Sequence, residues 1–158
     1  MKNRSAAGTT CLLLSVKPRF ANDILDGIKR FEFRRTCFRR RDVARVLLYA
    51  TSPEKRVIGE CTIETVLALA PDRLWSQTKE HAGIDRTYFD AYFEGRAEGY
   101  AIKVKDPQRY KVPLGLFEHF GLSHPPQSFC YVQGARSGLL DGAISIRRIM
   151  QWFPGSSL

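Results

Sequence analysis

The sequence predicts an α+β protein, a small mixed β-barrel of about six strands with short helices around it and a further helix at the C-terminal end. Three observations lead to this fold class. Short segments either alternate between apolar and polar residues or form brief apolar runs, as strands do. Longer segments between them place apolar residues at helical spacing. Glycine or proline stands at most of the boundaries.

Length and composition fit one folded domain. The chain has 158 residues, of which 44% are hydrophobic and 26% charged, and these values argue against general disorder. Residues 1–9 are expected to be a flexible leader, 10–134 the domain, and 135–158 a helical extension. No apolar run approaches the roughly 20 residues that cross a bilayer, so we expect a cytoplasmic protein without a membrane partner.

The first half of the chain predicts four strands and one helix. A buried strand is expected at 12–16, and Pro18 then opens a helix that ends at Gly27. The other strands are expected at 30–34, 46–50 and 57–66, and Gly59 inside the last of them predicts a bulge or a bend at a barrel corner.

The second half alternates between the two kinds of element. Helices are expected at 71–81 and 86–94, a strand at 99–104, a loop through Pro107 and Pro113, a short helix at 114–120, a strand at 129–132, and a helix from 136 onward. The helix at 86–94 carries four aromatic residues, for which core packing is the expected role: Tyr88, Phe89, Tyr92 and Phe93.

The charge of the chain indicates the class of partner, and its cysteine spacing bears on metal binding. Lys and Arg number 25 against 16 Asp and Glu, a formal net charge of +9, and a basic domain attracts polyanions such as nucleic acid. An acidic protein partner on the basic face is the alternative. The four cysteines form no Cys-x-x-Cys pair, so we expect reduced thiols, no metal site and no cofactor.

Several short stretches together resemble the ASCH domain family. They are LSVKPRFA at 14–21, ILDGIKRFEFR at 24–34, and shorter matches at 48–53, 58–60 and 125–129. The resemblance spans about residues 12–132, most of the chain. ASCH domains belong to the PUA-like superfamily, whose members often bind RNA. The resemblance therefore implies a PUA-like domain that binds RNA or a modified nucleotide.

The candidate RNA-binding residues come from this resemblance and from strand geometry. In the strand at 30–34, Phe31 and Phe33 should face a core while Glu32 and Arg34 project from the other face. Cations for phosphate, with an acceptor and a donor for a base edge, would then meet at one cleft: Ser15, Lys17, Lys29, Glu32 and Arg34. An aromatic residue would stack on the base, and Tyr49, Trp75 and Tyr131 are the candidates. The run Arg39, Arg40 and Arg41 would extend the phosphate-binding surface or simply be solvated.

Two enzymatic alternatives also follow from the resemblance. One ASCH subgroup resembles an amidohydrolase with a lysine followed three residues later by a nucleophilic threonine, but here Glu32 follows Lys29 at that distance. A metal-dependent ribonuclease is the other alternative, and Glu32, Glu60 and Asp85 are its candidate carboxylates. If the protein is an enzyme, Lys29, Glu32 and Asp85 are the expected catalytic residues.

Overall fold

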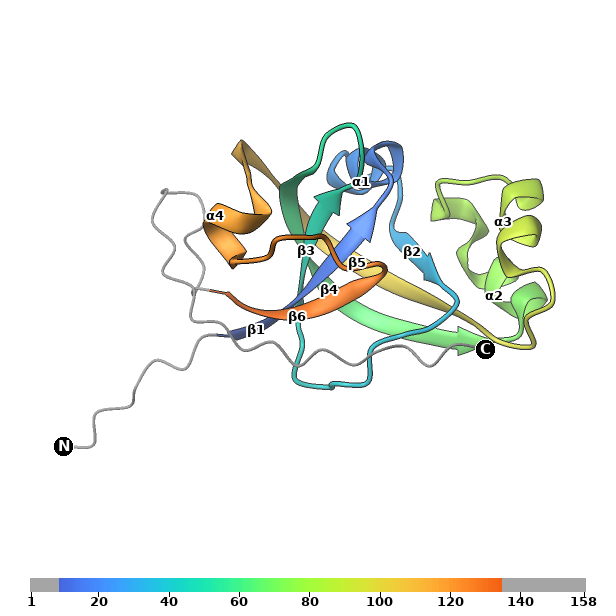
Figure 1. The fold of residues 1–158 in the computed structure, drawn as a ribbon. Coiled ribbons are helices and arrows are strands. Elements are labelled where there is room, and N and C mark those ends of the chain that lie inside the picture. The colour runs from blue at the N-terminus through green and yellow to red at the C-terminus, as the bar shows by residue number, and fades with distance from the viewer. Residues whose placement is uncertain (1–8, 135–158) are drawn as a thin grey trace.

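One six-stranded mixed sheet forms the centre of the molecule (Figure 1). The structure is a computed structural model that describes residues 9–134. Strands lie in the order β2-β5-β4-β3-β1-β6; β1 pairs with β3 in parallel and every other pair is antiparallel. The strands are β1 (Thr9–Val16), β2 (Phe31–Arg34), β3 (Arg45–Ala50), β4 (Arg56–Leu69), β5 (Gly99–Leu114) and β6 (Phe129–Gly134).

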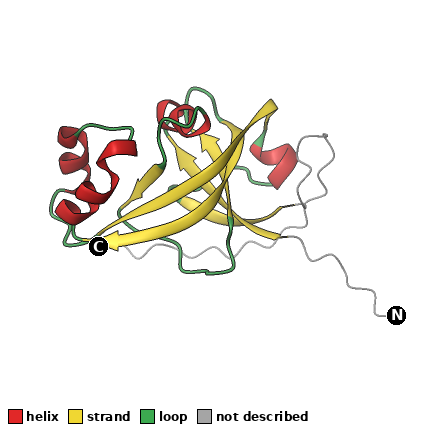
Figure 2. Cartoon of the chain, turned by 180° about the vertical axis from the view of Figure 1, so that it is seen from behind, coloured by secondary structure: helices red, strands yellow, loops and turns green. Residues whose placement is uncertain are grey.

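Short helices surround the sheet, as predicted. They are α1 (Pro18–Leu25), α2 (Pro71–Thr78), the 3-10 helix η1 (Lys79–His81), α3 (Arg86–Phe93) and α4 (Leu116–Phe120). Figures 1 and 2 show α2 and α3 together at one end of the molecule, beyond β2, and α4 at the other end. No helix among residues 9–134 is long and apolar enough to span a membrane. Residues 1–8 of the predicted leader at 1–9 and the predicted C-terminal helix lie outside the described residues, and Thr9 belongs to β1.

The predicted closure into a barrel is wrong, because the two edge strands β2 and β6 do not pair. The β2 strand has only four residues, and all of its ladder is made with β5. A side chain crosses the gap instead: the Arg34 guanidinium donates to the Ser15 carbonyl at 2.7 Å and to the Ser128 hydroxyl at 3.2 Å. The fold is therefore a curled, open sheet whose opening is bridged by Arg34.

The strand β5 is longer than the sequence predicts, since it continues through the proposed loop at Pro107 and Pro113. The β4–β5 ladder is irregular where Pro107 falls, so the missing proline N–H leaves no regular ladder position empty. The predicted bulge at Gly59 is confirmed by register shifts between Val57 and Gly59 in the ladders with both β3 and β5. A Cβ atom there would lie 2.5 Å from the Gln108 carbonyl oxygen, so only glycine fits.

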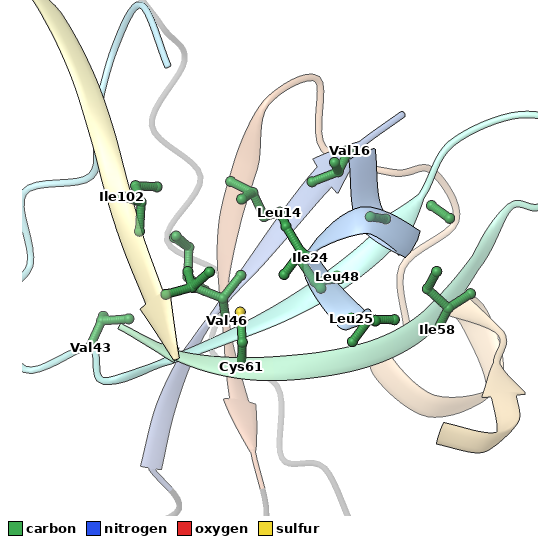
Figure 3. Packing of buried hydrophobic residues seen from close by; sticks show 14 residues of the cluster. Leu14, Val16, Ile24, Leu25, Val43, Val46, Leu48, Ile58, Cys61 and Ile102 are labelled. Carbon is green, nitrogen blue, oxygen red and sulfur yellow. The ribbon is translucent and has the colours of Figure 1, made fainter. Parts of the chain in front are cut away.

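Two apolar layers position the site. The main core lies between α1 and the sheet, where Figure 3 shows Leu14 and Leu48 packed against Ile24. A smaller cluster joins β2 to the α2–α3 pair, and in it the rings of Phe33 and Phe89 lie 5.2 Å apart. The predicted core role of Phe33 is thus confirmed, and the contact fixes α3 beside β2.

Candidate functional site

A cleft of about 170 Å³ opens between the end of β1, the start of α1, the strand β2 and the helix α3. Its lining residues are Ser15, Val16, Lys17, Phe20, Lys29, Glu32, Phe33, Arg34, Ile84, Tyr88 and Tyr92. Five of these are the polar residues that the sequence places at one cleft. The structure brings all five together.

The acidic and basic groups of the cleft form an ion pair on β2. Glu32 Oε1 lies 3.2 Å from the Arg34 guanidinium, and the two side chains are only 9% and 11% exposed. Side chains two residues apart in a strand share a face, and this spacing sets the pair. Arg34 Nε is buried and has no hydrogen-bond partner among residues 9–134. The cleft therefore offers a carboxylate acceptor beside a guanidinium donor.

Lys29 is buried at the base of the cleft, with 2% of its surface exposed. Its ammonium group donates to the Ala82 carbonyl at 2.6 Å and lies 4.7 Å from the centre of the Phe33 ring. Burial lowers the pKa of Lys29, and the negative charge of Glu32 opposes this shift. Gly83 makes room for the lysine: its φ is +68°, and a Cβ there would lie 2.7 Å from the Lys29 Cβ. The lysine is thus a desolvated cation, unlike a surface lysine.

The mouth of the cleft has a second cation and an aromatic wall. Lys17 donates from Nζ to the Tyr88 hydroxyl at 3.2 Å, and its Nζ lies 5.6 Å from the centre of that ring. Phe20 of α1 meets Tyr88 edge to face at 5.5 Å. Lys17 and Tyr88 thus lie together in the lining of the cleft.

Two of the four aromatic residues of α3 are functional candidates that the sequence assigned to the core. Phe89 and Phe93 are buried as predicted, whereas Tyr88 is 38% exposed and lines the cleft together with Tyr92. The Tyr92 hydroxyl donates to the Phe33 carbonyl at 3.2 Å, and burial raises its pKa. The sequence contains a pattern that indicates this role, because the two tyrosines stand four residues apart and therefore share one face of the helix.

The aromatic residues predicted to stack on a base are not at the cleft, and this part of the prediction is wrong. Tyr49 is buried in a different core cluster, because strand alternation turns it to the same face as Leu47. Trp75 packs against Phe89 with their ring centres 5.0 Å apart. Tyr131 instead lies under the Arg40 guanidinium, 5.3 Å from its ring centre.

The arginine run occupies the loop between β2 and β3. Arg39 and Arg41 are exposed, whereas Arg40 forms an ion pair with Asp42 and donates to the Thr10 hydroxyl at 3.3 Å. None of the three lines the cleft. Their part in phosphate binding stays a prediction, and Arg40 has the least free charge of the three.

The carboxylates proposed for a metal site do not form one. Asp85 caps α3, where its side chain accepts a hydrogen bond from the Tyr88 amide at 2.8 Å. Glu60 accepts from the Tyr110 hydroxyl at 2.6 Å, and only Glu32 lines the cleft. Within the described part of the chain, no three His, Cys, Asp or Glu side chains come together as a metal would need. Asp85 therefore caps a helix in this structure, and its catalytic role stays a prediction.

Several known proteins are similar to this chain over most of its length. The family model described as ASCH domain matches residues 14–109. An ASCH domain-containing ribonuclease of Zymomonas mobilis is 32% identical over 124 residues, which are 77% of this chain and 83% of the relative. A crystal structure of ASCH from Zymomonas mobilis superposes with a TM-score of 0.72 at 31% identity, covering 78% of this chain and 87% of that one.

A ribosomal protein matches over part of its length. This large ribosomal subunit protein of Ureaplasma parvum is 29% identical over 127 residues, which are 79% of this chain. The chain spans only 40% of that relative.

A tyrosine-to-phenylalanine variant of the Zymomonas mobilis protein also superposes with a TM-score of 0.72, at 30% identity, covering 78% of this chain and 90% of that one.

Proposed function

The chain belongs to the ASCH domain family, whose fold is PUA-like, and on this premise we propose that it binds RNA through the cleft between α1, β2 and α3. One observation carries the proposal. Five polar residues from separate segments, predicted to meet, line the same cleft: Ser15, Lys17, Lys29, Glu32 and Arg34. The net charge of +9 favours a polyanionic ligand.

In this proposal each cleft residue contacts a different part of one nucleotide. Lys17 at the mouth neutralises a phosphate, and Tyr88 offers its ring to the base. Glu32 accepts a hydrogen bond from a base amino group, as carboxylates do with cytosine. Arg34 holds Glu32 in place through their ion pair. The base is therefore read by a buried pair and the backbone by an exposed lysine.

Replacing Glu32 by Gln should weaken base preference and leave most of the salt-dependent affinity. A lost base contact costs about 1–3 kcal/mol of discrimination, roughly 5–150-fold between the best and the poorest base. Fluorescence anisotropy with four labelled homopolymeric hexanucleotides measures the ratio. The matched control is Glu94→Gln, which removes the same charge from an exposed position outside the cleft. An unchanged ratio in Glu32→Gln would contradict the reading role.

Ribonuclease activity is the second candidate function, and the Zymomonas mobilis relative favours it. The buried Lys29 suits general-base chemistry, since its lowered pKa leaves more neutral amine than an exposed lysine has. The amine would take the proton of a ribose 2′-hydroxyl. The 2′-oxygen would then attack the adjacent phosphorus and the bond to the 5′-oxygen would break, leaving a 2′,3′-cyclic phosphate and, after protonation, a 5′-hydroxyl.

If RNA is cleaved, the Lys29→Met variant should lose about 100-fold or more of the rate, as expected for loss of a general base. The wild-type rate should rise with pH up to the lowered pKa of Lys29 and then level off. Gel analysis of a 5′-labelled oligonucleotide, with magnesium, manganese or a chelator, gives both results. The control Lys79→Met changes an exposed lysine outside the cleft. Cleavage that survives in Lys29→Met would assign the chemistry to another residue, and intact RNA in every wild-type reaction would leave binding as the function.

A further inference from the structure

A second hollow is lined in part by the turn that carries Lys29. It is a groove of about 320 Å³, formed by the turn between α1 and β2, by β4 and by the middle of β5. Its lining residues are Ile24, Gly27, Lys29, Arg30, Glu64, Lys103, Val104, Lys105, Asp106 and Pro107. Lys29 is common to the groove and the cleft. The proposed nucleotide site does not use the other groove residues.

The groove has an excess of positive charge. Four of its lining residues are cationic and two are anionic. Lys103 is neutralised by Glu64, whose Oε2 lies 2.8 Å from its Nζ. The side chains of Arg30 and Lys105 form no hydrogen bond or ion pair with other residues among 9–134. The hydrogen bond from Lys103 lowers the pKa of the Glu64 carboxyl, and the nearby positive charges of Lys105 and Arg30 lower it further. Two cations are left to bind an anion.

Local backbone geometry sets these charges side by side. Lys103 and Lys105 are two residues apart on β5 and share a face of the strand. The β4–β5 register shifts between Ile63 and Thr65, so Glu64 falls at the irregularity beside Lys103. The Val104 amide donates to the Arg30 carbonyl at 3.0 Å and ties the turn to β5. The groove is therefore part of the ordered sheet.

We propose that this groove binds the sugar-phosphate backbone of the RNA nucleotide adjoining the one in the cleft. The inference rests on the proposed RNA-binding function and names its second subsite. Gly27, Lys29 and Arg30 bring the turn after α1 into the lining of both the groove and, through Lys29, the cleft. Unpaired Arg30 and Lys105 hold phosphate oxygens as they would on any sequence, since phosphate contacts carry no base information. The groove thus adds affinity and salt dependence while the cleft selects the base.

The test compares two double variants of equal charge change. Arg30→Ala/Lys105→Ala removes the free cations of the groove, and Arg96→Ala/Lys111→Ala removes one arginine and one lysine that line neither hollow. Affinities for a trinucleotide and for the matching nucleoside monophosphate are measured from 50 to about 300 mM salt. We expect the groove variant to bind the trinucleotide about tenfold more weakly, with a salt slope smaller by about 1.4, the value for two single-strand phosphates. Its affinity for the monophosphate should match that of the wild type.

The outcomes separate this inference from the function on which it rests. Equal trinucleotide affinity for the groove variant and the control would overturn the groove subsite, while base preference lost in Glu32→Gln would still support the cleft. An equal loss for trinucleotide and monophosphate would also overturn it, because the groove would then hold a phosphate of the first nucleotide. A wild-type protein that binds no RNA at any salt concentration would overturn both.

Discussion

Replacing Arg34 by Ala should lower the free energy of unfolding by about 3–5 kcal/mol, because it leaves a buried carboxylate without its partner. Glu32 is 9% exposed in its side chain and has this guanidinium 3.2 Å away. The same substitution removes the hydrogen bonds to the Ser15 carbonyl and the Ser128 hydroxyl, which span the opening between the two edges of the sheet. Electrostatic and structural losses therefore add at one residue.

Urea unfolding followed by circular dichroism measures this loss. Arg41→Ala is the matched control, since the Arg41 side chain is exposed and forms no hydrogen bond or ion pair with other residues among 9–134. This substitution should change the free energy of unfolding by less than about 0.5 kcal/mol. The double variant Glu32→Leu/Arg34→Met should recover much of the stability, because neither charge then stays buried alone. A loss below about 1 kcal/mol in Arg34→Ala would show that the sheet does not depend on this bridge.

Replacing Phe89 by Ala should also cost about 3–5 kcal/mol, the range for a buried ring that leaves a cavity. Phe89 is fully buried, and its ring lies 5.2 Å from Phe33, 4.8 Å from Phe93 and 5.0 Å from Trp75, centre to centre. These contacts hold α3 against β2. RNA affinity should fall as well, since α3 carries Tyr88 and Tyr92, which line the cleft.

The neighbouring Tyr88→Ala variant separates packing from binding. Tyr88 is partly exposed at the cleft, so its removal should lower RNA affinity while costing only about 1 kcal/mol of stability. Thermal and urea unfolding, with anisotropy on the same samples, give both quantities. Equal stability losses for the two variants would mean that the cluster beneath α3 is not the support of the cleft.

Local signals in the sequence were sufficient for most of the fold. Pro18, Pro71 and the alternation around Phe31 set element boundaries that depend on nearby residues, and these predictions lie within a few residues of α1, α2 and β2. The same alternation placed Glu32 and Arg34 on one face. The cleft residues met as predicted because the turn after α1 and the strand β2 are adjacent in the chain.

The errors concern contacts between distant segments. Whether β2 meets β6 depends on the curl of the whole sheet, and no short stretch encodes it. Strand β5 passes through Pro107 only because its partner β4 is irregular there. Tyr49 and Tyr88 exchanged roles for a similar reason: which face of an element meets ligand and which meets core is decided by the neighbour packed against it.

The placement of α2 and α3 has an evolutionary consequence. Both helices lie in the connection between β4 and β5, two long strands whose pairing already holds the ends of that connection together. Such a loop can change in length and sequence without disturbing the ladder. Lys17, Lys29 and the Glu32–Arg34 pair come from the segments around α1 and from β2, whereas Tyr88 and Tyr92 come from this connection. A change in this one connection would therefore alter the two tyrosines of the cleft while leaving its charged residues in place.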